Sequence, residues 1–294
     1  MKHKLSIILT ILIIFLLTQF IGLAVINSYT NTPLPYGMQP SADINNSQGF
    51  ISIIISFAIA IGLIFLLMKY KWKAVIRIWF FIVITLALSI SINALLKNYF
   101  SFSTILASLI ALPLAYLKLF KPNVISHNLT EILIYPGLSV VFIPILGIWS
   151  IIILLILISI YDMWMVWKTG LMQKMAKFQM NELKIFGGLL IPYMSKRVKQ
   201  QIANLKKSKS KKDKNKKIKI QTAILGGGDI VFPLITAGIF LRTFGLIPAL
   251  FVVAGAFAGL LFLFTISQPK KSYPAMPYIT AGMFVAMILA YLIL

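Results

Sequence analysis

The chain has 294 residues, 60% of them hydrophobic, and a mean hydropathy of +0.94, far above that of soluble proteins. The protein is therefore expected to lie in a membrane. It contains no cysteine, which excludes disulfide bonds, thiol catalysis and cysteine-ligated metal sites. The formal net charge of +22 would suggest a nucleic-acid partner for a soluble chain. In a membrane protein, basic residues mainly record topology, so no nucleic-acid partner is expected.

Apolar runs of about 20 residues, the length that crosses the hydrocarbon core, predict the membrane spans. Nine such runs cover residues 5–26, 50–68, 78–96, 102–120, 129–146, 148–167, 220–240, 246–266 and 273–294. The fifth and sixth are separate because residues 129–167 are too long for one crossing, and Pro136, Gly137, Pro144 and Gly147 provide places to turn. The first run could be a secretory signal, but its length favours a retained span. The predicted fold class is an all-α membrane protein with nine transmembrane helices.

The distribution of Lys and Arg predicts the orientation of these spans. When the N-terminus is placed in the cytoplasm, 26 of the 28 basic residues fall on the cytoplasmic side, and only Lys97 and Arg242 fall outside. The N-terminus is therefore predicted to be cytoplasmic and the C-terminus to lie outside. The expected location is the plasma (cell) membrane, as a multi-pass protein in contact with the lipid bilayer.

A long cytoplasmic loop, residues 168–219, divides the chain into a six-span region (residues 1–167) and a three-span region (residues 220–294). Residues 170–194 of this loop mix apolar side chains with lysines, which predicts a helix lying at the membrane interface. The lysine-rich run 206–217 has low complexity and repels itself, so we expect a disordered linker.

Two of the six acidic residues, Asp162 and Asp229, lie well inside apolar runs. A charge at mid-bilayer costs roughly 2.5–3.5 kcal/mol, so an acid retained there is usually functional or paired. Each acid also has a distinctive local context. Asp162 directly follows Tyr161, and Asp229 directly follows Gly226, Gly227 and Gly228.

A Tyr-Asp pair in one span and Gly-x-Gly-Asp in the next resemble the presenilin and signal-peptide-peptidase family of intramembrane aspartyl proteases. A third element, Pro274-Ala275-Met276, stands where that family has Pro-Ala-Leu. The resemblance implies a presenilin-like, prokaryotic and archaeal-type endopeptidase that cleaves transmembrane-helix peptides, such as remnant signal peptides or type I membrane segments. It also implies that Asp162 and Asp229 are catalytic and that the remaining motif residues support the active site. No cofactor and no metal are implied.

Elimination leads to the same pair of carboxylates. The two histidines, His3 and His127, fall at the terminus and in a predicted loop, so neither a zinc protease nor an intramembrane Ser–His pair is expected. Asp162 lies six residues before Lys168 and Asp229 ten residues after Lys219, which places both acids in the cytoplasmic half of the bilayer. Two carboxylates that lie close together in a low-dielectric site tend to share one proton and can activate a water for peptide hydrolysis.

The residues around the acids have expected roles of their own. The three glycines are expected to let a substrate backbone approach Asp229. The family resemblance implies that Pro274 and Pro277 leave backbone groups at the start of the last span free to pair with an extended substrate. Glu131 has no assigned role and is interpreted as an acid at the N-terminus of a helix.

Two other classes of protein remain as alternatives. In a secondary transporter or channel, Asp162 and Asp229 would be proton or cation sites, and the glycine run would be a broken-helix binding site. No inverted repeat supports that interpretation. A membrane scaffold with a basic tail would leave both buried acids unexplained. A role of segment 170–194 in receiving substrate, a role as a surface anchor, homo-oligomerisation and accessory subunits all remain open.

Overall fold

In the computed structural model, the described residues are 5–38, 72–169, 186–193, 221–268 and 273–293, together with a few positions between 51 and 70. Most of the predicted second span (50–68), the lysine-rich run (206–217) and most of the predicted interfacial helix (170–194) lie outside them.

The described chain is predominantly helical. Its α-helices are α1 (Leu5–Ser28), α3 (Lys73–Leu96), α4 (Ser103–Phe120), α5 (Val124–Phe142), α6 (Ile148–Trp164), α10 (Gly228–Phe244), α11 (Leu246–Ile266) and α12 (Met276–Ile293). Short helical turns cover Pro35–Gly37 and Ile143–Ile145, and a π-turn over Met165–Thr169 extends α6. The break between α5 and α6 falls at Pro144 and Gly147, two of the four predicted turn positions, whereas Pro136 and Gly137 lie inside α5.

Seven of the helices in the described ranges are long and apolar enough to cross a membrane. The helix α10 has 17 residues and packs against α1, α5 and α11 in the same bundle. The prediction of a multi-pass helical membrane protein is therefore confirmed, with seven candidate spans among the described residues against nine predicted.

A two-stranded antiparallel sheet corrects the all-α prediction. Strand β1 (Gly188–Tyr193) pairs with β2 (Gln221–Gly226), and the register runs from Gly188 opposite Gly226 to Tyr193 opposite Gln221. The predicted span 220–240 is therefore wrong over Gln221–Gly226, and the predicted interfacial helix is wrong over β1. Ala223 and Leu225 are buried while Ile224 is exposed, which is the two-residue period of a strand.

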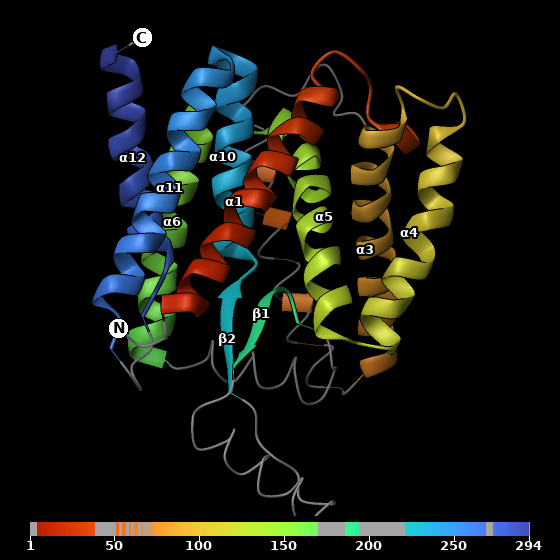
Figure 1. Ribbon diagram of the computed structural model, residues 1–294, viewed down its shortest axis with the longest axis horizontal. Coiled ribbons are helices and arrows are strands. Elements are labelled where there is room, and N and C mark those ends of the chain that lie inside the picture. The colour runs from red at the N-terminus through yellow and green to blue at the C-terminus, as the bar shows by residue number, and fades with distance from the viewer. Residues whose placement is uncertain are drawn as a thin grey trace, which may run out of the picture.

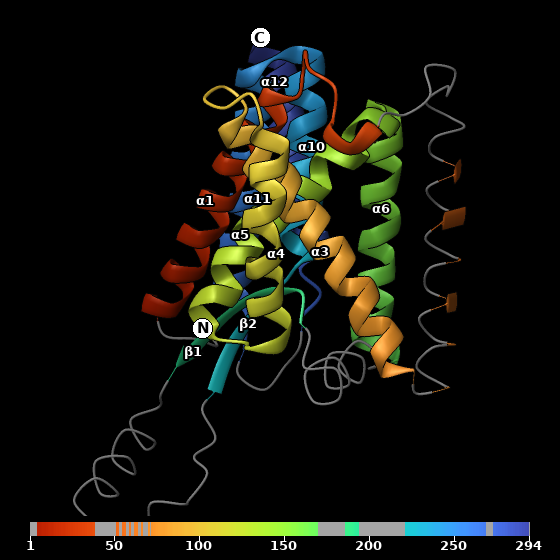
Figure 2. The ribbon, with the colours of Figure 1, turned by 90° about the vertical axis from the view of Figure 1, so that its right-hand side faces the viewer.

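The helices form two groups joined by a central pair (Figure 1). On one side α3, α4 and α5 pack together, on the other α6, α11 and α12 pack together, and α1 and α10 lie between the groups. Both views place the sheet at the end of the bundle where α1 and α5 begin and where α6 ends (Figures 1 and 2). The central pair packs closely, because a Cβ at Gly22 of α1 would lie 2.4 Å from the side chain of Leu234 of α10.

Lys97, one of the two basic residues predicted to lie outside, has a structural role at the end of α3. Its ammonium group donates hydrogen bonds to the Ser28 carbonyl, at the end of α1, and to Thr32 Oγ1 at 2.6 Å, and it lies 4.5 Å from the ring centroid of Tyr29. Burial lowers the pKa of Lys97 and raises the pKa of Tyr29 to about 12. Lys97 thus satisfies a carbonyl that α1 leaves free at its C-terminus.

Candidate active site

Asp229 lies at the junction of the sheet with α10. Strand β2 ends at Gly226, and α10 begins two residues later, which places Asp229 in the first turn of that helix. The carboxylate folds back over the turn, and the backbone of Gly226 donates a hydrogen bond to it. A Cβ at Gly226 would lie 3.2 Å from Asp229 Oδ2. The partial positive charge of the helix N-terminus favours an acid at this position.

Asp162 lies in the last turn of α6 and is buried, with 6% of its surface exposed. Its Oδ2 accepts a hydrogen bond from the backbone N–H of Met276 at 3.1 Å. Since α12 begins at Met276, Asp162 satisfies one of the N–H groups that a helix leaves free at its N-terminus. A second bond joins the same two helices, from Ser159 Oγ to Thr280 Oγ1 at 2.9 Å.

The three sequence motifs therefore meet where α6, α10 and α12 come together. Asp229 interacts electrostatically with Asp162, and Asp162 is bound in turn by the backbone of the Pro274-Ala275-Met276 segment. Pro274 and Met276 are buried, whereas Tyr161 is 50% exposed. The backbone N–H of Met276, at the start of α12, is bound to Asp162.

The three glycines differ in what surrounds them. A Cβ at Gly227 would lie 2.9 Å from the hydroxyl oxygen of Tyr135, and a Cβ at Gly226 would lie against Asp229 itself. Around Gly228 the nearest atoms belong to Phe232, at 3.6 Å and 3.8 Å, which is ordinary contact. Gly226 and Gly227 therefore make room for side chains of this protein, whereas a methyl group at Gly228 would fit in ordinary contact with Phe232.

Sequence reasoning missed a buried polar cluster behind the glycine turn. Lys118 of α4 donates a hydrogen bond to Glu131 Oε1 of α5, and the two side chains are 3% and 2% exposed. His127 Nε2 lies 2.8 Å from the carbonyl oxygen of Gly188, which ties α5 to β1. The predicted loop position of His127 and the predicted helix-terminal role of Glu131 are both wrong, since α5 begins at Val124 and both residues are buried within it.

His127, Glu131 and Tyr135 follow one another at four-residue intervals and so share one face of α5. This spacing was a recognisable signal in the sequence. The predicted span 129–146 does not include it, because the apolar run begins after His127.

The surroundings of His127 are those of a structural side chain, and they show neither the serine of a Ser–His pair nor the ligands of a zinc protease among the described residues. Its ring nitrogens contact Lys118, Glu131 and the carbonyl of Gly188, and no serine hydroxyl is bonded to it in the described ranges. No group of three or more His, Cys, Asp or Glu side chains that could hold a metal ion occurs among those residues either.

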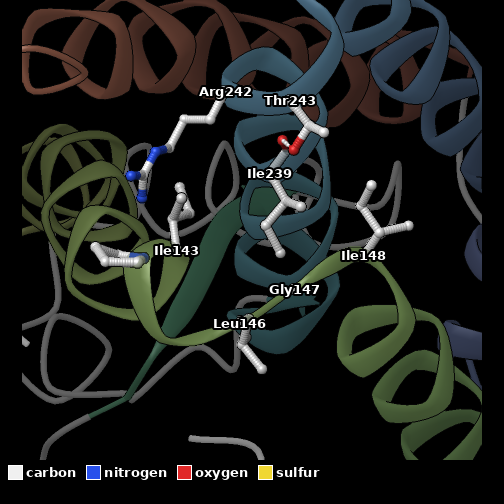
Figure 3. Close-up of a pocket in the computed structure, with 8 residues that line it drawn as sticks. Ile143, Leu146, Gly147, Ile148, Ile239, Arg242 and Thr243 are labelled. Atoms are coloured by element: carbon white, nitrogen blue, oxygen red, sulfur yellow. Dashed lines mark hydrogen bonds between the residues drawn. The ribbon is translucent and has the colours of Figure 1, made fainter. Parts of the chain in front are cut away.

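Two cavities near the far end of α10 lie apart from the acids. One, of about 500 Å³, is lined by Ile143, Pro144, Leu146, Gly147, Ile148, Ile239, Arg242 and Thr243. Figure 3 shows Arg242 reaching from the end of α10 toward Ile143. The other, of about 760 Å³, is an apolar groove that includes Phe240, Phe244 and Met287. Neither contains Asp162, Asp229 or another motif residue.

Comparison with known proteins agrees with this arrangement. The sequence profile of the family described as signal-peptide peptidase, presenilin aspartyl protease matches residues 12–294. Two crystal forms of a presenilin family intramembrane aspartate protease, C222 and P2, have similar structures, each with a TM-score of 0.64 and 16% identity. The matches cover 98% and 97% of this chain and 99% and 98% of those chains. No curated protein matches the sequence.

The fold and the meeting of the three motifs define a polytopic membrane protein of the aspartic protease class. The chain belongs to the signal-peptide peptidase and presenilin family of aspartyl proteases. It is an intramembrane aspartic endopeptidase, and the alternative of a transporter or channel is not supported.

Proposed function

We propose that Asp162 and Asp229 are the catalytic pair that hydrolyses peptide bonds in transmembrane helices. The observation that carries this proposal is the convergence of Asp229 with Asp162, whose own carboxylate is bound by the N–H of Met276. Asp229 lies in the first turn of α10, and the Asp162 carboxylate, from the last turn of α6, meets the N-terminus of α12, so each carboxylate faces a helix N-terminus that favours its ionised form against the cost of burial. Mutual repulsion then makes a single shared proton the favourable state.

In that state the two carboxyl groups do different work. The ionised partner takes a proton from a water molecule, and the protonated partner donates to the carbonyl oxygen of the scissile peptide bond. The water oxygen adds to the carbonyl carbon, and the tetrahedral intermediate collapses with loss of the amine. No covalent enzyme intermediate is formed.

We further propose that the substrate is held in an extended conformation along β2. The backbone N–H and C=O of Leu190 both bind the side chain of Asn128, at 2.9 Å and 2.8 Å, so they face away from β2. Ile224 lies opposite Leu190, and the two members of such a non-hydrogen-bonded antiparallel pair turn their backbone groups away from each other. The backbone groups of Ile224 therefore point away from β1, at the outer edge of β2, which leads directly to the Gly226–Asp229 turn.

Four finer features belong to the same proposal. The chain has nine spans, a cytoplasmic N-terminus and an external C-terminus, because the basic residues divide 26 to 2 on that assignment. The six-span region (residues 1–167) and the three-span region (residues 220–294) each supply one acid. The substrates are remnant signal peptides or type I segments, the location is the plasma membrane, and homo-oligomers are compatible with the fold. Tyr161 and Pro274-Ala275-Met276 support the pair.

Binding of a peptide isostere of the tetrahedral intermediate tests this function. The hydroxyl group of such an isostere occupies the place of the attacking water between two carboxylates. We expect the purified protein to bind a hydroxyethyl-containing apolar peptide and to lose that binding in Asp229→Asn. A peptide that binds equally well to both forms would contradict the proposed dyad.

A further inference from the structure

Lys118, His127 and Glu131 form a buried network that is complete without Tyr135. Lys118 donates to Glu131, and its ammonium nitrogen lies 3.5 Å from His127 Nδ1. His127 Nε2 lies 2.8 Å from the Gly188 carbonyl oxygen. These contacts are all satisfied when His127 is neutral with its proton on Nε2, so that Nδ1 accepts from Lys118. The charge of the Glu131 carboxylate is then neutralised by Lys118.

Tyr135 stands one turn beyond Glu131 on the same face of α5 and is 4% exposed. Its hydroxyl has no hydrogen-bond partner among the residues that the structure describes. A buried hydroxyl without a partner is unfavourable and rare in native proteins, so its retention calls for a functional or structural reason. Phenylalanine would fill the same space without leaving a polar group unpaired.

The position of this hydroxyl supplies a reason. It lies over the glycine turn, at 2.9 Å from the place of a Cβ on Gly227, within reach of Glu131, with which it interacts more strongly, and of Asp229. Glu131 is already paired with Lys118, whereas the donor to Asp229 is the backbone of Gly226. The hydroxyl hydrogen is free to rotate, and donation to an ionised carboxylate is stronger than donation to a neutral acceptor.

We propose that Tyr135 is a positioning residue of the active site, whose hydroxyl donates a hydrogen bond to the ionised Asp229 carboxylate. The Lys118–Glu131 pair and the contact with Gly227 hold the ring in place for this role. The inference rests on the proposed role of Asp229. It goes beyond it by adding a third side chain, from α5, to the pair supplied by α6 and α10.

The variant Tyr135→Phe tests this directly. Initial rates of cleavage of a transmembrane-helix peptide are measured against pH in the purified full-length protein. Removing a donor to a charged group is expected to lower kcat about tenfold to a hundredfold, with KM changed less than about twofold. Because the bond favours the ionised carboxylate, its loss is expected to move the acid limb of the pH–rate profile to higher pH by about one unit. The groups facing Tyr135 are Glu131 and Asp229, with Lys118 and His127 behind Glu131.

Tyr29→Phe is the matched control. This variant also removes a phenolic hydroxyl. Unlike that of Tyr135, the hydroxyl of Tyr29 is hydrogen bonded, to the Ile90 carbonyl at 2.9 Å, and it lies at the opposite end of α1 from the sheet. Tyr29→Phe is expected to lower thermal stability without moving either limb of the profile. An acid limb in Tyr135→Phe that coincides with that of the wild type, even with reduced activity, would show that Tyr135 only fills space and would overturn the inference.

Replacement of Tyr135 by 3-fluorotyrosine keeps the shape of the side chain and makes its hydroxyl a stronger donor, so the test does not depend on the folding of one variant. The acid limb is expected to move to lower pH, opposite to its shift in Tyr135→Phe. Equal profiles for tyrosine and fluorotyrosine would also contradict the inference. Failure of this inference is distinguishable from failure of the proposed function, because cleavage that persists in Asp229→Asn contradicts the dyad whatever happens at position 135.

Discussion

At the scale of residues, the glycines before Asp229 illustrate how one motif serves several purposes. Gly226 accommodates the carboxylate of Asp229, Gly227 accommodates the phenol of Tyr135, and Gly228 lies in ordinary contact distance of Phe232. A side chain would therefore have a different effect at each position. The same reasoning applies to Met276, whose backbone N–H binds Asp162 and whose side chain is 3% exposed.

Gly227→Ala is expected to destabilise the protein, because the new Cβ would lie 2.9 Å from the hydroxyl oxygen of Tyr135. Overpacking of this kind typically costs about 1–3 kcal/mol. The matched variant is Gly228→Ala, whose Cβ would meet Phe232 at an ordinary 3.6 Å. Thermal unfolding should show a lower Tm for Gly227→Ala alone. Equal Tm values for the two variants would contradict this account of the turn.

Both acids and all three motifs could be predicted from the sequence, because charges inside apolar runs stand out in a single chain. The residues that contact the acids could not be predicted. The bond between Asp162 and Met276 joins residues 114 apart, and the contact of Tyr135 with Gly227 depends on how α5 packs against α10. Glu131 was visible as an acid, but its pairing with Lys118 required the true start of α5.

At the scale of elements, the apolar helices were predicted closely and the sheet was not. The bounds of α11 agree with the predicted span, and α4 differs from its prediction by one residue. Strand β2 was absorbed into a helical span, since a short apolar run next to a helix has no periodicity long enough to separate the two structures. Its pairing partner β1 lies more than 25 residues earlier, inside the segment 170–194 that has an interfacial-helix composition and beyond the lysine-rich run 206–217.

Ile224→Pro tests the proposed role of the free edge of β2. The N–H of Ile224 faces away from β1, so proline removes a donor that the sheet itself does not use. We expect kcat/KM to fall about fivefold to tenfold, since a backbone hydrogen bond contributes about 1 kcal/mol net, while Tm changes little. Leu225→Pro removes a donor to β1 instead and should lower Tm. Unchanged kcat/KM in Ile224→Pro would exclude binding of substrate at this edge.

At the scale of the whole molecule, the arrangement of helices places the chemistry at one end of the bundle. Around the two acids lie the end of strand β2, the first turns of α10 and α12, and the last turn of α6. Glycines allow helices of this bundle to pack closely. At Gly255 and Gly282 the backbones of α11 and α12 approach each other. Topology relative to the membrane was predicted from charge, and Lys97 shows why one basic residue departs from the rule.

Labelling of single cysteines tests the predicted orientation, and the absence of native cysteine removes any background. A cysteine in place of Ser41 is expected to react with a membrane-impermeant thiol reagent in intact cells, because the loop that contains it is predicted to lie outside. A cysteine in place of Ser210 should react only after permeabilisation. The reverse pattern would invert the topology and the preference for substrates with an external N-terminus.

The activity of the two acid variants tests the central claim most directly. Asp162→Asn, Asp229→Asn and the double variant are to be compared as purified, folded proteins, with cleavage of a transmembrane-helix peptide followed by mass spectrometry. Asparagine keeps the shape of the side chain but cannot ionise, so each single change is expected to lower the rate at least about a hundredfold. The double variant should be no worse than either single one, because the acids act as a unit. Tm should be unchanged or higher, since a buried acid is unfavourable for folding. Substantial cleavage by either folded single variant would contradict the proposed catalytic pair.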